Sequence, residues 1–254
     1  MSTLKQSFSW WCYANKGVEA PELLKAAARI GYAGVELIEP ELWQMARDEG
    51  LTIVSVGGHA SIEQGMNRPD NAARIERELH ENIDRAVAFG IPNLICFSGN
   101  RDGISDVAGL DNCAQVLERV APVAEQAGVT LIMELLNSKV DHRDYQCDHS
   151  AWGVELCQRV NSPAFKLLYD IYHMQIMEGD VIRTIGEHHT WFAHYHTAGN
   201  PGRGFIGEEQ EVNYPAVVRA IEKTGYTGYI GHEFLPSGDP LQELQEAFDL
   251  CQGA

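Results

Sequence analysis

The stretch VTLIMELLN at residues 129–137 decides the fold. It is an almost continuous apolar run with a single acidic residue, Glu134, close to its carboxyl end. Strands that are covered on both faces, as in parallel sheets, show such runs instead of a strict apolar–polar alternation. Seven further runs predict strands at residues 7–13, 34–39, 51–58, 93–99, 165–173, 191–198 and 228–234.

Segments with apolar residues at helical spacing separate most of these strands. In one of them, Ile75, Leu79, Ile83 and Val87 recur every four residues, with charged residues between them. Another ends at Gly31, which is predicted to cap a helix at its C-terminus. The predicted helices cover residues 21–31, 73–90, 112–128, 152–160, 180–188, 214–225 and 240–251.

This alternation of strands and helices predicts a (β/α)8 TIM barrel that forms one domain over residues 1–254. Barrels of this kind commonly run to about 250 residues as one unit. The segments GYAGVELIE at 31–39 and GYTGYIGHE at 225–233 look like two copies of one turn–strand unit that ends in a carboxylate. Repeated units suit a barrel better than the alternative, a doubly wound open sheet.

The charge balance limits the kinds of partner that the chain is expected to bind. The chain has 36 acidic and 19 basic residues, which gives a formal net charge of −17. Binding to nucleic acid or to an anionic membrane needs a basic surface, so neither partner is expected. A divalent metal ion and a small substrate remain compatible with this charge. The sequence leaves the oligomeric state open, including a homo-oligomer.

The location is predicted to be cytoplasmic. No apolar run approaches the roughly 18 residues that span a bilayer, and the N-terminal residues do not resemble a secretory signal. The six cysteines are irregularly spaced in a chain too large to need disulfide staples. They are expected to be reduced thiols.

Four consecutive predicted strands each carry a potential metal ligand near the carboxyl end. These residues are Glu134, Asp170, His196 and Glu233. A charged side chain within an apolar strand is costly to bury unless it is paired or binds a metal. Because neighbouring strand ends converge in a barrel, the four side chains are predicted to surround one ion.

Three carboxylates and one imidazole form a mostly hard, oxygen-rich ligand set. Such a set suits Mn²⁺ or Mg²⁺ best, and Co²⁺ or Zn²⁺ is also compatible with it. The alternative for each carboxylate is a structural role, such as capping the following helix or pairing with a lysine. His194 shares a face with His196 and is predicted to be a hydrogen-bonded core residue.

Several segments of the chain resemble the hydroxypyruvate isomerase family. LLYDIYHMQIMEGD at residues 167–180 looks like the family's sixth-strand segment. NPGRG at 200–204 and EVNYPAVVRAIEKTGYTGYIGHEFLP at 211–236 are similar to its C-terminal quarter. The first hundred residues match only in general, with RIGYAGVELIEP at 29–40 as the best piece. The wider group is the xylose-isomerase-like barrels, which also includes ketose 3-epimerases, inosose-processing enzymes and endonuclease IV.

The resemblance implies roles for individual residues. The family's four metal ligands fall on the four residues named above, and its candidate acid and base fall on Glu134 and Glu233. His173 matches a residue that contacts a substrate oxygen, and Arg203 matches one that grips the substrate's polar end. The implied activity is isomerisation of a small hydroxy-carbonyl compound, of the hydroxypyruvate to tartronate semialdehyde type, by proton transfer through an enediolate. His59 and Trp11 are expected to line the pocket, with core packing or capping as the alternative.

Two departures from the family bear on the substrate. Hydroxypyruvate isomerases tend to carry Gln at the third ligand position, whereas this chain has His196, which is usual in the 3-epimerases. Lys139 and Asp141 lie in a loop that does not map onto the isomerase loop. A ketose 3-epimerase, or an inosose isomerase or dehydratase, is therefore the alternative function. Phosphodiester hydrolysis of the endonuclease IV type is disfavoured by the net charge and by the lack of extra His and Asp ligands.

Overall fold

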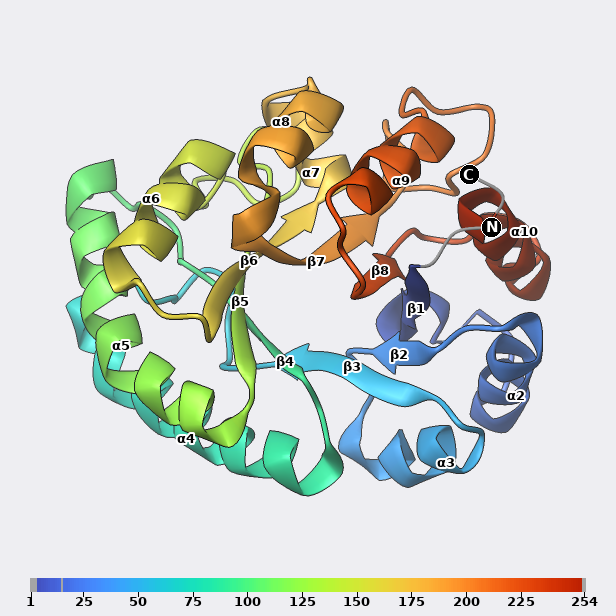
Figure 1. The fold of residues 1–254 in the computed structure, drawn as a ribbon, viewed down its shortest axis with the longest axis horizontal. Helices are drawn as coiled ribbons and strands as arrows, with labels where there is room; N and C mark the ends of the chain where they lie inside the picture. The colour runs from blue at the N-terminus through green and yellow to red at the C-terminus, as the bar shows by residue number, and fades with distance from the viewer. Residues whose placement is uncertain (1–3, 15, 253–254) are drawn as a thin grey trace. The chain divides into compact units, whose positions relative to one another are not determined.

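The eight strands of the protein close into a parallel barrel in the order β1 to β8 (Figure 1). The computed structural model describes residues 4–14 and 16–252. The predicted (β/α)8 barrel is confirmed, and the open sheet is wrong. The strands are β1 Lys5–Ser9, β2 Gly34–Glu36, β3 Thr52–Gly57, β4 Asn93–Cys96, β5 Thr130–Glu134, β6 Phe165–Asp170, β7 Phe192–Thr197 and β8 Tyr229–His232.

Helices follow the strands along the chain. The helices among the described residues are α1 Trp10–Tyr13, α2 Ala20–Ile30, α3 Trp43–Asp48, α4 Pro69–Phe89, α5 Asp106–Ala127, α6 Ser150–Val160, α7 Ile171–Met177, α8 Val181–His188, α9 Tyr214–Lys223 and α10 Pro240–Gln252. Two short 3₁₀ helices are η1 Pro40–Leu42 and η2 His189–Trp191.

The predicted strands are too long at their carboxyl ends. Residues 10–13 form the helix α1, and residues 171–173 begin the helix α7. Both helices bury most of their residues, so their apolar residues continue the apolar run of the strand before them. Composition alone therefore cannot separate the strand from the short buried helix that follows it. The helix α3 was not predicted, because its six residues are too few to show a helical period.

The described residues form two compact units. The first contains residues 4–14, 16–54, 180–189 and 194–252, and the second contains residues 55–179 and 190–193. Two of the four boundaries lie inside strands, between Val54 and Ser55 in β3 and between Ala193 and His194 in β7.

In the first unit, β1 lies between β2 and β8. Ser7 is in register with Gly34 of β2 and with Gly231 of β8. The helices α2 and α10 pack beside these strands (Figure 1). Tyr32 donates a hydrogen bond to the carbonyl of Leu244 at 2.9 Å and so links the turn after α2 to α10. The predicted cap of α2, Gly31, is observed with a φ of 120°.

In the second unit, α4 and α5 run along the outside of β4 and β5 (Figure 1). Ile75, Leu79 and Ile83 are buried on α4 as predicted, but Val87 is 56% exposed. The reason is geometric. A repeat of four residues advances about 40° beyond a full turn at each step, because the helix has 3.6 residues per turn. Three steps carry Val87 about 120° away from Ile75 and out of the buried face.

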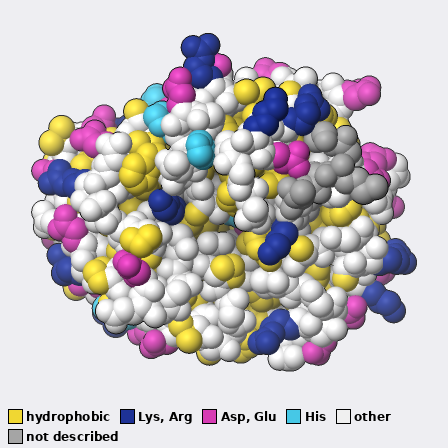
Figure 2. Space-filling model, viewed as in Figure 1, with side chains coloured by type: hydrophobic (Ala, Val, Ile, Leu, Met, Phe, Trp, Pro, Cys, Tyr) yellow, Lys and Arg dark blue, Asp and Glu magenta, His cyan; other side chains and the backbone are white. Residues whose placement is uncertain are grey.

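The charges are dispersed on the face shown in Figure 2, where acidic and basic side chains are scattered and do not gather into one patch. No helix in residues 4–14 and 16–252 is long and apolar enough to cross a membrane. All six cysteines are free and buried, as expected for reduced thiols.

Candidate active site

Glu134 and Asp170 are the last residues of two neighbouring strands in the second unit. They end β5 and β6, whose register pairs Glu134 with Leu168, and both side chains are buried. Oδ1 of Asp170 accepts the backbone N–H of His173 at 2.9 Å and caps α7. Asp170 therefore has the structural role that was the alternative to metal binding. The cap uses only one of its two carboxylate oxygens, so capping and metal binding are compatible.

The loop after β5 fixes the ring of His173. Oδ1 of Asn137 accepts the backbone N–H groups of Val140 and Asp141, each at 2.9 Å, which determines how the amide is oriented. The amide nitrogen of Asn137 then lies 2.6 Å from Nδ1 of His173 and 2.6 Å from Oδ2 of Asp141. Because an amide nitrogen can only donate, Nδ1 of His173 is the acceptor, and the proton of the neutral ring lies on Nε2.

Lys139 and Asp141 in the loop after β5 both have partners within the fold. Asp141 also accepts a hydrogen bond from the hydroxyl of Tyr172 at 2.8 Å. Lys139 donates to the carbonyls of Ile176 and Met177 at the end of α7, at 2.8 and 3.1 Å. Together they tie the loop after β5 to α7, the helix that carries His173.

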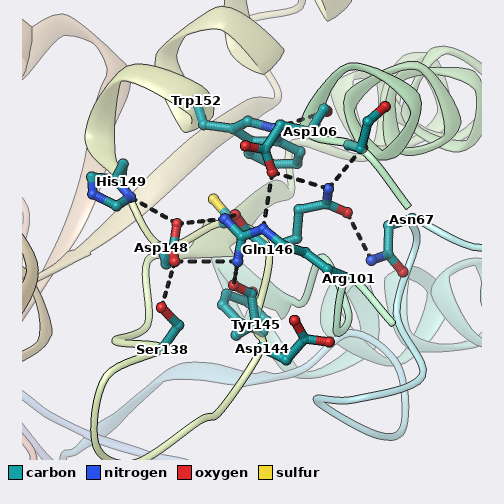
Figure 3. Close-up of polar contacts among 12 residues, drawn as sticks. Asn67, Arg101, Asp106, Ser138, Asp144, Tyr145, Gln146, Asp148, His149 and Trp152 are labelled. Carbon is teal, nitrogen blue, oxygen red and sulfur yellow. Dashed lines mark hydrogen bonds and ion pairs between the residues drawn. The ribbon is translucent and has the colours of Figure 1, made fainter. Parts of the chain in front are cut away.

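A second set of contacts holds the far end of the same loop (Figure 3). The carboxylate of Asp148 is bound by the guanidinium of Arg101 at 2.9 and 3.2 Å. It also accepts from Ser138 at 2.5 Å and lies 2.8 Å from Nδ1 of His149. Arg101 donates further to the carbonyls of Tyr145 and Gln146. Burial alone would raise the pKa of Asp148, but these hydrogen bonds outweigh it and lower the pKa.

Changing Arg101 to Met should destabilise the protein by about 3 kcal/mol at neutral pH, because it leaves the buried Asp148 charge without its main partner. Urea unfolding measures this effect. The matched control is Arg119→Met, which breaks an exposed ion pair with Glu76 and should cost at most about 1 kcal/mol.

The lowered pKa of Asp148 means that its ion pair with Arg101 stabilises the fold at neutral pH. That contribution is lost as the pH falls from about 4, the ordinary Asp value, through the folded pKa. If Arg101→Met lowered the free energy of unfolding by as much at acidic pH as at neutral pH, this assignment would be contradicted.

In the first unit, Glu233 lies directly after β8, and several polar side chains contact its carboxylate. The indole Nε1 of Trp11 donates to Oε1 at 2.9 Å, and the hydroxyl of Ser9 lies 3.4 Å from the same oxygen. Oε2 accepts from Nη2 of Arg203 at 2.7 Å and lies 3.1 Å from Nδ1 of His196. Burial would raise the pKa of Glu233, but His196 and Arg203 outweigh it and hold the pKa well below its usual range.

Arg203 reaches Glu233 because its loop folds back. Arg203 has a left-handed φ of 56°, and its carbonyl accepts the backbone N–H of Leu235 at 2.8 Å. Gly199 N–H donates to the carbonyl of Gly204 at 2.7 Å and closes the loop. A Cβ at Gly199 would lie 2.4 Å from the carbonyl oxygen of Phe205, so only glycine fits there. The guanidinium carbon lies 5.2 Å from the centre of the Trp11 ring, which is within cation–π range.

A further acidic residue, Glu36 at the end of β2, was not among the predicted site residues. Its fully buried Oε2 lies 2.8 Å from Nε2 of His194 and 3.1 Å from Nε2 of His196. Burial would raise the pKa of Glu36, but the two histidines outweigh it and lower the pKa. The segment GYAGVELIE predicts a strand-end carboxylate at Glu39, but β2 ends at Glu36 and Glu39 is exposed. An acidic residue inside an apolar run was the available signal. The predicted core role of His194 is confirmed.

The pair formed by His196 and Glu233 is consistent with a bound cation. A charged His196 ring donates to both Glu36 and Glu233 and so lowers the pKa of Glu233, whereas a neutral ring that donates from Nε2 to Glu36 has a lone pair on Nδ1. That lone pair faces the carboxylate of Glu233 at 3.1 Å, so two acceptors oppose each other. Such a contact is favourable only if a positive charge lies between them, either a proton or a metal ion. Buried acidic and histidine groups of this kind could hold a metal ion.

His59 has a different environment. Its Nε2 accepts the backbone N–H of Phe97 at 3.0 Å, and its Nδ1 lies 3.1 Å from the carbonyl of Ala60. Both ring nitrogens therefore bond to backbone, and burial lowers the pKa of the ring. This is the capping alternative for His59, and a contact with substrate stays a prediction.

The chain matches a known protein family over most of its length. The model of the family described as xylose isomerase-like TIM barrel matches residues 24–252. The chain belongs to the xylose isomerase-like TIM barrel family. This agrees with the strand-end carboxylates and with the barrel in which they lie.

Relatives within this family carry isomerase names. A putative hydroxypyruvate isomerase from Homo sapiens is 28% identical over 240 residues, which cover 88% of this chain and 87% of the relative. A 2-oxo-tetronate isomerase from Pectobacterium atrosepticum is 26% identical over 84% of this chain and 86% of the relative. A crystal structure of AP endonuclease, family 2 from Brucella melitensis superposes with a TM-score of 0.84 at 25% identity, covering 95% of this chain and 97% of that one.

Proposed function

We propose that this protein is a metal-dependent aldose–ketose isomerase that acts on a small hydroxy-carbonyl compound, of the hydroxypyruvate to tartronate semialdehyde type. The isomerase class is supported by relatives that are named hydroxypyruvate isomerase and 2-oxo-tetronate isomerase. The observation that carries the proposal is the set of buried ligand groups at the ends of four consecutive strands.

The proposed ligands of one divalent ion are Glu134, Asp170, His196 and Glu233. Each offers a buried nitrogen or oxygen atom, and three carboxylates with one imidazole suit Mn²⁺ or Mg²⁺. A bound ion of this kind would polarise the substrate carbonyl and acidify the neighbouring carbon–hydrogen bond.

Side chains of the protein would transfer the proton and bind the substrate. One of Glu134 and Glu233 removes a proton from the substrate carbon, and the other assists its return to the adjacent carbon. His173 offers the N–H of Nε2 to a substrate oxygen, since Asn137 donates to its Nδ1. Arg203 is placed beside Glu233 and would bind the substrate's carboxylate or hydroxyl end. The indole of Trp11, bonded to Glu233, would hold that carboxylate in position.

A ketose 3-epimerase is the second candidate, because His196 replaces the Gln that is usual in hydroxypyruvate isomerases. The two activities differ only in where the proton returns. In an isomerase it reaches the adjacent carbon, and in an epimerase it reaches the opposite face of the same carbon. The buried free thiols also fit a reducing compartment, and we place the enzyme in the cytoplasm.

An assay of the purified protein with Mn²⁺ or Mg²⁺ against hydroxypyruvate, 2-oxo-tetronate and a panel of ketoses tests the proposal. We expect interconversion of a three- or four-carbon hydroxy-carbonyl acid, with products identified by NMR. Epimerisation of ketohexoses without isomerisation would favour the second candidate. Cleavage of abasic-site DNA, with no turnover of any small substrate, would overturn both and point to the activity named for the Brucella structure.

A further inference from the structure

Glu36 is a fully buried carboxylate that has no role in the proposed reaction. It receives three donors from β1 and β7. The hydroxyl of Ser7 bonds to Oε1, and the Nε2 atoms of His194 and His196 lie 2.8 and 3.1 Å from Oε2. A buried carboxylate is stable only when donors satisfy its oxygens, and this one is satisfied by three.

Each ring nitrogen of His196 faces a different buried carboxylate. Its Nε2 faces Glu36 and its Nδ1 faces Glu233, each at 3.1 Å. A cation bound beside Glu233 would need the lone pair of Nδ1, which leaves the proton of the neutral ring on Nε2, facing Glu36. The lone pair of Nδ1 then points toward Glu233, the other proposed ligand of the first unit.

Gly231 provides the space for this contact. A Cβ at position 231 would lie 2.2 Å from Oε1 of Glu36 and 3.0 Å from Cδ2 of His196. No side chain can therefore stand between the carboxylate and the imidazole. Gly231 is in register with both Ser7 and His196 in the neighbouring strands, at the level where Glu36 meets its donors.

We propose that Glu36 is a positioning residue that accepts a hydrogen bond from the Nε2–H of His196 and thereby directs Nδ1 of His196 at the metal ion. This inference rests on the metal-dependent function proposed above. Histidine ligands commonly donate their second nitrogen to a carboxylate, which sets the ring orientation and makes the ligating nitrogen more basic.

A different assignment of the same residues must be separated from this one. Glu36, His194 and His196 each offer an atom within 4.8 Å of the others, so they could themselves bind an ion. In that case Glu36 and His194 would be ligands, and removing either would abolish binding. If Glu36 only positions His196, its loss weakens binding, and the loss of His194 has a smaller effect.

The experiment measures Mn²⁺ affinity of metal-stripped protein by calorimetry for wild type, Glu36→Gln, Gly231→Ala and His194→Gln. The control is Glu39→Gln, an exposed glutamate three residues from Glu36. We expect Glu36→Gln and Gly231→Ala to weaken binding by about 10- to 100-fold. We expect Glu39→Gln to bind as wild type does. Gly231→Ala keeps the carboxylate but displaces it, so the two variants test the contact in different ways. Urea unfolding establishes that each variant is folded.

A second readout observes the proton directly. In Zn²⁺-loaded protein labelled with ¹⁵N-histidine, His196 should show a proton on Nε2 and none on Nδ1. The proposal is overturned if the proton is on Nδ1, if Glu36→Gln binds Mn²⁺ as tightly as wild type, or if His194→Gln and Glu36→Gln both abolish binding. Correct affinities and proton position without turnover of any substrate would leave the positioning role standing and remove the isomerase function instead.

Discussion

Replacing Glu134 or Glu233 by Gln should lower turnover by about 10²- to 10⁴-fold, the usual contribution of a positioned acid or base. Gln retains the size of the side chain and an oxygen that can bind a metal, but it cannot take a proton. Turnover on the best substrate of the panel is measured for each variant at saturating Mn²⁺. For Glu233, the substitution also removes the charge that Arg203 contacts at 2.7 Å, so KM should rise as well.

Three measurements keep this prediction specific. Metal content is determined for each variant, because a loss of metal would lower activity for another reason. The corresponding Ala variants should bind metal more weakly than the Gln variants. Turnover in heavy water should place deuterium on the reacting carbon, unless the transferred proton is fully shielded from solvent. If both Gln variants kept near-normal turnover with a full complement of metal, the glutamates would be ligands only.

Removing the metal should reduce turnover to the background rate, and adding Mn²⁺ or Mg²⁺ should restore it. The same change should lower thermal stability. Without a cation, the lone pair of His196 and the carboxylate of Glu233 oppose each other at 3.1 Å, or a proton must be taken up between them. Metal at about 100 times its Kd should stabilise the fold by about 2.7 kcal/mol through mass action. Activity assays and thermal unfolding before and after dialysis against EDTA measure both effects.

Asp170→Asn provides the matched variant for this experiment. Its remaining carbonyl oxygen can still cap α7 by accepting the N–H of His173, so the local fold should be retained. The loss of charge should nonetheless weaken metal binding and reduce the thermal shift. Full activity of EDTA-treated protein, checked for residual metal, would contradict a metal-dependent reaction.

The sequence by itself was sufficient for the barrel and for the candidate ligands. Apolar runs such as 129–137 predict buried parallel strands because burial on both faces leaves no polar alternation. An acidic residue within such a run stands out because a buried charge needs a partner. That reasoning applies to Glu134 and Asp170 without any knowledge of their neighbours. It applied equally to Glu36, but the predicted strand was drawn three residues too long and the strand-end carboxylate was placed at Glu39.

Only the tertiary structure decided which atoms of these residues face each other. Glu36 meets His194 and His196 across 158 and 160 residues of chain, and Trp11 meets Glu233 across 222. A local pattern carries no information about such contacts, because strand register and loop closure determine them. The same holds for the ring proton of His173, which depends on the orientation of one amide in the loop after β5. Sequence therefore determined which residues could do chemistry, and the fold decided which of their atoms face each other, since hydrogen bonds form between neighbours in space.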